Sequence, residues 1–139
     1  MILTRRWKCV VSVCLAVGGF VLFSGLIFAD ATQFPDPHSG WLQRVPENDR
    51  ARRNPFATDP QAAQAGQKLF QQNCASCHGK TAEGKGKRPN LRSETIQQAT
   101  PGELQWLLTN GSLKAGMPSW SRLPEQQRWQ LVTYLKTLN

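Results

Sequence analysis

The residues best suited to chemistry lie in one short stretch, Asn73 to Lys80, which reads NCASCHGK. Cys74 and Cys77 are separated by two residues, and His78 directly follows the second cysteine. Thiolates and imidazoles bind metals, two neighbouring thiols can form a redox-active disulfide, and the same groups can bind a cofactor covalently. The stretch therefore predicts a metal site, a disulfide-exchange site or the attachment site of a cofactor.

Two of these interpretations fit the rest of the sequence poorly. A disulfide-exchange motif is expected beside a βαβ pattern, and no alternating stretch of this chain is typical of a strand. A structural zinc ion needs four ligands, and the second histidine, His38, lies far from the motif in the sequence. The third interpretation is covalent haem c, in which two thiols form thioethers with one macrocycle and the adjacent imidazole faces the iron.

A haem iron bound by His78 has a second axial position, for which the sequence offers few side chains. Met1 belongs to an N-terminal targeting segment, so Met117 and His38 are the main candidates, besides lysines. Met117 lies in a Gly-Met-Pro sequence. Gly116 allows the backbone to approach the macrocycle closely, and the following proline stiffens the loop. We predict Met117 as the distal ligand, with His38 as the alternative.

The elements that must position these residues are predicted to be helices. Asp59 can cap a first helix that begins with proline and ends in the cysteine motif. A second helix follows Thr100, which forms a capping box with Glu103. The last helix is expected from Pro124 to about Leu138, with an apolar stripe but a poor cap.

Residues 79–94 are rich in Gly, Lys and Arg, and they predict a long loop between the first two helices. The resulting all-α domain, residues 59–139, is small for a self-sufficient hydrophobic core. A macrocycle in the centre of the domain would supply the missing apolar material.

The N-terminal part of the chain is predicted to direct it to a membrane. Arg5, Arg6 and Lys8 precede an uncharged apolar stretch, residues 9–29. This stretch is long enough for a spanning helix, which needs about 20 residues, and longer than the usual apolar core of a cleaved signal. We expect a membrane anchor, with cleavage near Ala31 as the alternative. Either outcome places the rest of the chain outside the cytoplasm.

Residues 30–58 are rich in proline and show no sustained periodicity. They predict a linker, or an arm lying over the domain, between the N-terminal segment (1–29) and the helical domain.

The formal net charge is +8 for 139 residues. Three basic and no acidic residues lie in residues 1–29, which leaves +5 for the remainder. This charge is too dilute, in an exported chain, to indicate nucleic-acid binding.

Taken together, the motifs of residues 60–139 resemble the monohaem class I c-type cytochromes. The resemblance implies a small cytochrome c-like helical domain wrapped around one covalent haem. It also implies that the first and last helices cross at a glycine, that the Pro89 carbonyl accepts a hydrogen bond from His78, and that Leu91 packs on the haem. The motifs that carry it occur in the family's order: Gly66 and Phe70, C-A-S-C-H, R-P-N-L at 88–91, Gly-Met-Pro, and Leu131 with Tyr134.

The expected function is one-electron transfer without enzymatic activity, on the periplasmic side of a bacterial inner membrane. Filling both axial positions with His78 and Met117 leaves no coordination site for a substrate. The alternatives are a haem enzyme or gas sensor in which Met117 dissociates, and a fixed subunit of a larger dehydrogenase or oxidase complex. Basic residues near the motifs are candidates for docking an acidic redox partner: Lys80, Lys85, Lys87, Arg88, Arg92 and Lys114.

Overall fold

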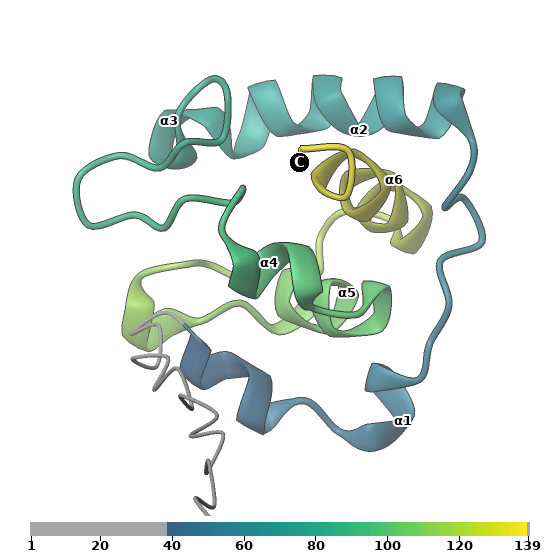
Figure 1. The fold of residues 1–139 in the computed structure, drawn as a ribbon, viewed down its shortest axis with the longest axis horizontal. Coiled ribbons are helices and arrows are strands. Elements are labelled where there is room, and N and C mark those ends of the chain that lie inside the picture. Colours follow the sequence, from purple (N-terminus) through teal and green to yellow (C-terminus); the bar gives the residue numbers. More distant parts are fainter. Residues whose placement is uncertain (1–38, 139) are drawn as a thin grey trace, which may run out of the picture. The chain divides into compact units, whose positions relative to one another are not determined.

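The computed structural model describes residues 39–138, and these residues form helices joined by loops (Figure 1). They contain no named strand, and their β-type pairing is limited to two isolated bridges, Lys85 with Arg88 and Ser112 with Met117. No helix among them is both long enough and apolar enough to cross a membrane. The predicted anchor, residues 9–29, and His38 lie outside the described residues. In order, the elements are η1 (Ser39–Arg44), α1 (Glu47–Arg50), α2 (Pro60–Asn73), α3 (Ala75–His78), α4 (Glu94–Gln98), α5 (Pro101–Asn110), η2 (Leu113–Ala115) and α6 (Glu125–Leu135).

The helices α2 and α5 begin at the capping residues that the sequence predicts. The Asp59 carboxylate accepts a hydrogen bond of 2.8 Å from the backbone N–H of Gln61, and Pro60 occupies the first turn. At α5, the Thr100 hydroxyl accepts from the Glu103 N–H, and the Glu103 carboxylate accepts from the Thr100 N–H. Both caps satisfy N–H groups that have no partner within the helix.

The longest helix, α2, crosses α6 at Gly66, as the resemblance implies (Figure 1). A Cβ atom added at Gly66 would lie 2.0 Å from the carbonyl oxygen of Gln130, so the two backbones are in contact there. Beside this point the rings of Phe70 and Tyr134 lie 5.4 Å apart with a tilt of 52°. Phe70 and Leu131 are almost completely buried. The crossing therefore forms the centre of the hydrophobic core.

The helix α6 is shorter than the sequence predicts. It starts at Glu125 after Pro124, which makes no side-chain cap, and it ends at Leu135 instead of near Leu138. The N–H groups of Thr137 and Leu138 bond to carbonyls three residues earlier, so the chain tightens beyond Leu135. A second difference is the short helix α4, which the sequence did not predict and which begins at the last residue of the predicted loop.

Residues 39–58 pack on the helical domain instead of extending away from it. Trp41 and Val45 are buried in the main core. The carbonyl oxygen of Arg50 accepts a hydrogen bond of 3.0 Å from the Thr100 hydroxyl. A Cβ atom at Gly102 would lie 2.0 Å from a backbone oxygen of the same segment. The segment therefore lies directly against the start of α5.

Candidate haem site

The cysteine motif occupies a single turn of helix directly after α2. The N–H groups of Cys77 and His78 bond to the carbonyl oxygen of Cys74 at 3.1 and 2.9 Å, which closes α3. Cys74 is half-buried and Cys77 is exposed, and both are free thiols. This turn places the three side chains on the wall of one cavity.

The cavity has a volume of about 320 Å³ and opens into the hydrophobic core. Besides the motif, the sequence-predicted site residues Pro89, Leu91 and Met117 all line it. The structure thus brings together all six residues that the sequence singled out. Large apolar side chains from η1, α2, α4, α5, the loop before α6 and α6 itself also line the cavity: Trp41, Phe70, Ile96, Leu107, Leu108, Trp120, Leu131 and Leu135.

A backbone hydrogen bond fixes the orientation of the His78 ring. Nδ1 of His78 lies 3.0 Å from the carbonyl oxygen of Pro89, the contact that the resemblance implies. Because a carbonyl oxygen can only accept, Nδ1 carries the proton and Nε2 keeps a free lone pair. Burial lowers the pKa of His78, and the nearby charge of Arg88 lowers it further, against an opposing effect of the Pro89 hydrogen bond. A neutral imidazole with a free Nε2 is the form that binds a metal.

The two thiols of the motif differ in their environments. Burial, and to a smaller extent the neighbouring Cys77, raises the pKa of Cys74 to about 11. Cys74 is therefore protonated at neutral pH in the free polypeptide.

Among residues 39–138, no group of three or more His, Cys, Asp or Glu side chains is placed to hold a metal ion. Within that range, nothing favours a zinc site built from side chains alone.

Met117 lies in a loop that closes on itself. Ser112 and Met117 form two backbone hydrogen bonds of 2.9 and 3.0 Å, one in each direction. Between them lies η2, and Gly116 directly follows it with a φ of 70°, in the left-handed region that glycine adopts readily. The Met117 side chain is half-buried and packs against the main core.

These residues fit a haem c. A largely apolar cavity in the centre of the core suits the macrocycle, free thiols suit thioether attachment, and an oriented neutral imidazole suits the iron. Met117 lines the same cavity, and its thioether is a second axial donor available among the described residues. Each of these features is supplied by the residues of the polypeptide itself.

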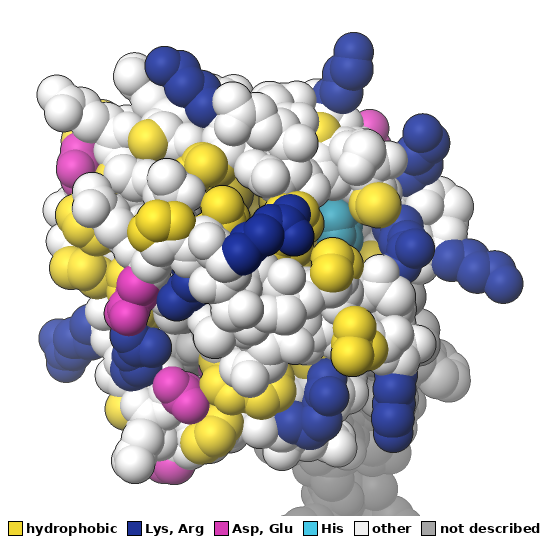
Figure 2. Space-filling model, turned by 180° about the vertical axis from the view of Figure 1, so that it is seen from behind, with side chains coloured by type: hydrophobic (Ala, Val, Ile, Leu, Met, Phe, Trp, Pro, Cys, Tyr) yellow, Lys and Arg dark blue, Asp and Glu magenta, His cyan; other side chains and the backbone are white. Residues whose placement is uncertain are grey.

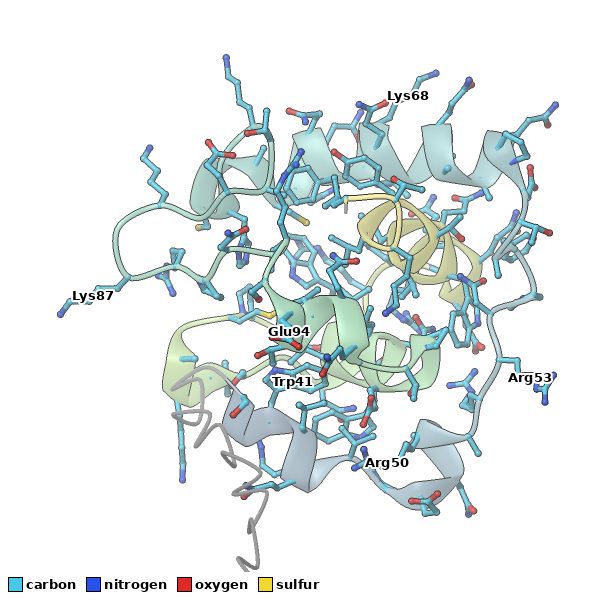
Figure 3. The ribbon with its side chains drawn as sticks, in the orientation of Figure 1. Trp41, Arg50, Arg53, Lys68, Lys87 and Glu94 are labelled. Atoms are coloured by element: carbon cyan, nitrogen blue, oxygen red, sulfur yellow. The ribbon has the colours of Figure 1, made fainter. Side chains whose placement is uncertain are left out.

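Trp41 and Arg88 are among the cavity-lining residues that sequence reasoning missed as contributors to the site. Trp41 lies in the predicted linker, yet it is only 5% exposed, and Figure 3 shows it directed from η1 toward the interior. A lone tryptophan among prolines gives little indication of burial. The sequence places Arg88 in the R-P-N-L motif and among the candidates for partner docking, whereas the structure half-buries it on the cavity wall. Of the three tryptophans in the C-terminal part, Trp120 lines the cavity.

The chain is similar to proteins of known type. It is 33% identical over 94 residues to the cbb3-type cytochrome c oxidase subunit CcoP of Azospirillum brasilense, covering 61% of this chain and 31% of that protein. It is 35% identical over 95 residues to the quinohemoprotein alcohol dehydrogenase ADH IIB of Pseudomonas putida, covering 66% of this chain and 12% of that protein. The chain thus spans less than a third of the length of either relative.

A solved structure supports the fold. Cytochrome cL from Methylophaga aminisulfidivorans superposes with a TM-score of 0.52 at 26% identity, covering 59% of this chain and 56% of that one. The profile of the family described as cytochrome c oxidase, cbb3-type, subunit III matches residues 61–135, more than half of the chain. That range contains the cysteine motif, the Pro89 segment and Met117. The chain therefore belongs to this family of class I-type c-type cytochrome domains, whose members bind haem c covalently.

Proposed function

We propose that this chain is a one-electron carrier in which Cys74 and Cys77 hold the haem and His78 and Met117 are its axial ligands. The observation that carries the proposal is the shared cavity wall: all four side chains line one apolar cavity of about 320 Å³. The haem supplies an iron that alternates between ferrous and ferric states. The polypeptide attaches it, orients His78 through Pro89 and keeps water away with the surrounding core.

Occupation of both axial positions favours electron transfer over catalysis. If His78 and Met117 both held the iron, no coordination site would remain for a substrate, and the methionine would raise the reduction potential. The bound haem would supply one-electron exchange in which no bond is made or broken. Ligation of the iron by both residues would therefore favour a redox protein that is not an enzyme.

A second candidate is a fixed cytochrome subunit of a larger complex. One relative is named as an oxidase subunit, and another is a quinohemoprotein dehydrogenase. In such a complex the same haem site would accept or deliver electrons within a permanent assembly. Detergent extraction followed by size-exclusion chromatography separates the two candidates, because a fixed subunit co-elutes with its complex and a mobile carrier elutes alone.

The basic surface supports docking to an acidic redox partner. In Figure 2, Lys and Arg side chains lie on several sides of the histidine, with few acidic side chains among them. The mature chain carries a positive net charge whether or not residues 1–29 remain. Complementary charge accelerates association at low ionic strength.

We place the domain on the periplasmic side of a bacterial inner membrane. The support is the basic and apolar N-terminal sequence, residues 5–29, together with the export that covalent haem attachment requires. Retention of that segment anchors the protein, and cleavage near Ala31 releases it into the periplasm. N-terminal sequencing of the purified membrane and periplasmic fractions distinguishes these outcomes.

Two spectra test the proposed function. Denatured, reduced holoprotein should retain haem through acid–acetone extraction and show the absorption of a haem with two thioether bonds. Replacing Met117 by Ala should abolish the long-wavelength band of methionine-ligated ferric haem without loss of covalent haem. Haem that acid–acetone extracts would overturn the attachment, and a band that persists in Met117→Ala would overturn the distal ligand.

A further inference from the structure

The side chain of Arg88 spans from the segment after the cysteine motif to the loop that carries Met117. Its Nη1 donates hydrogen bonds of 2.9 and 3.0 Å to the carbonyl oxygens of Ala115 and Gly116. Those carbonyls belong to the two residues directly before Met117. A guanidinium that binds two consecutive peptide groups restrains their orientation more than a single contact would.

The backbone at Arg88 is itself fixed on the His78 side of the cavity. Arg88 and Lys85 exchange backbone hydrogen bonds of 3.0 and 3.3 Å. The next residue, Pro89, accepts the hydrogen bond from Nδ1 of His78. Two consecutive residues therefore contact the two sides of the site: Arg88 contacts the methionine loop, and Pro89 contacts His78.

The tip of the methionine loop needs an external contact to hold its position. Residues 113–116 are all exposed, and Leu113 is 79% exposed. Their backbone bonds are local ones across the turn, such as Gly116 N–H to the Leu113 carbonyl at 2.9 Å. Arg88 adds contacts from a residue 27 positions away in the sequence.

The fit between Arg88 and Gly116 is close. A Cβ atom at Gly116 would lie 2.6 Å from Nη1 of Arg88, so any larger residue would displace the guanidinium. The glycine thus serves two purposes, a left-handed backbone and room for the arginine. The loop conformation and the arginine contact depend on each other.

We propose that Arg88 is a positioning residue that holds the Met117 loop against the His78 segment and so sets how firmly Met117 stays bound to the haem iron. This inference rests on the proposed function, because it requires Met117 to be the distal ligand. Loss of the two hydrogen bonds would let the loop tip move outward. An external ligand would then compete with Met117 more successfully.

The same segment provides a matched control. Arg92 carries the same charge, but its Nε donates to the carbonyl oxygen of Thr81 at 2.8 Å, within the segment itself. Arg92→Gln thus removes one positive charge near the site without touching the described contacts of the Met117 loop. Arg88→Lys keeps the charge at 88 but loses the planar, two-acceptor geometry.

The test is the affinity of imidazole for the ferric holoprotein, measured by loss of the methionine-ligand absorption band. Arg88→Gln should bind imidazole about tenfold more tightly than wild type, which corresponds to about 1.4 kcal/mol of weaker Met117 ligation. Arg88→Lys should fall between them. Arg92→Gln should lie within about twofold of wild type, since it alters charge alone.

Each outcome decides a separate point. Equal affinities in Arg88→Gln and Arg92→Gln would overturn the positioning role and leave only a charge effect. Should Arg88→Gln fail to assemble with haem, Arg88→Lys decides, and an affinity equal to wild type overturns the inference. If the wild-type holoprotein lacks the methionine-ligand band, both the proposed distal ligand and this inference are overturned. If the wild type shows the band, the proposed function stands, whatever the affinities of the variants.

Discussion

The absence of a side chain at position 66 decides how closely α2 and α6 approach. A Cβ atom there would meet the Gln130 carbonyl oxygen at 2.0 Å and the Cβ of Tyr134 at 2.9 Å. Backbone atoms of a packed helix cannot yield by that distance without a shift of the whole helix. Glycine in the middle of a helix costs about 1 kcal/mol relative to alanine, and the close crossing offsets that cost.

We expect Gly66→Ala to lower the free energy of unfolding by about 1–2 kcal/mol. Overpacking costs about 1–3 kcal/mol, and the cost here is expected in the upper part of that range, about 2–3 kcal/mol, because the contact at 2.0 Å is with backbone. The better helix propensity of alanine recovers about 1 kcal/mol of it. Urea unfolding of the holoprotein measures the change. Gly40→Ala is the control, because a Cβ at Gly40 meets nothing within 4 Å; a stabilised Gly66→Ala would show that the helices can separate freely.

At the scale of elements, the segment of residues 39–58 acts as part of the domain. Arg50 forms an ion pair with Glu103, whose side chain is only 5% exposed, and it also donates to the Leu42 carbonyl at 3.0 Å. Glu103 belongs to the capping box of α5, so one carboxylate links the segment to the start of that helix. A second ion pair, Arg52 with Glu125, links the same segment to α6.

Replacing Arg50 by Gln should destabilise the protein by about 1–3 kcal/mol, because the buried Glu103 carboxylate loses its charged partner. Urea unfolding again gives the free energy, and limited proteolysis between residues 50 and 58 reports whether the segment detaches. Glu47→Gln removes the exposed partner of the same arginine, an ion pair of 3.5 Å. This control should change stability by less than about 0.5 kcal/mol. Equal effects of the two variants would contradict a special contribution from Glu103.

At the scale of the whole molecule, the haem is expected to be a structural component. An empty cavity of about 320 Å³ would cost about 8 kcal/mol at about 24 cal/mol per Å³. That is comparable to the whole stability of a small domain, about 5–15 kcal/mol. Several helices line the cavity, so a shift of one helix alone would not fill the space that the haem is expected to occupy.

The chain produced without haem attachment should therefore lose cooperative unfolding and much of its helical signal. Circular dichroism during thermal unfolding, with the holoprotein as reference, measures both. A haem-free chain that unfolds cooperatively at nearly the holoprotein temperature would show that the core collapses onto itself.

Charge acts at the same scale through association with a partner. Lys87 extends from the loop after the cysteine motif, whereas Lys68 lies on α2 (Figure 3). Lys87→Glu should slow reduction by an acidic partner protein several-fold at low ionic strength, and the difference should shrink as salt screens the charges. Lys68→Glu makes the same charge change elsewhere and should have a smaller effect. Equal slowing in stopped-flow kinetics would indicate net charge, without a localised docking surface.

Much of the site could be predicted from the sequence because its features are local. The caps at Asp59 and Thr100 are set by neighbouring residues, and the structure confirms both. The glycine at 66 and its aromatic neighbour also lie where predicted. The end of α6 was predicted too late, since the apolar stripe continues to Leu138 while the hydrogen bonding tightens after Leu135.

The sequence by itself determined the helical class, the cysteine motif and the short set of candidate ligands, because residue type and spacing along one chain carry that information. Only the tertiary structure decided that Trp41 forms part of the cavity wall and that Arg88 reaches the methionine loop. Both are contacts between residues far apart in sequence, and such contacts depend on how the helices pack. No local pattern around a lone tryptophan or one arginine among several basic residues specifies its partner.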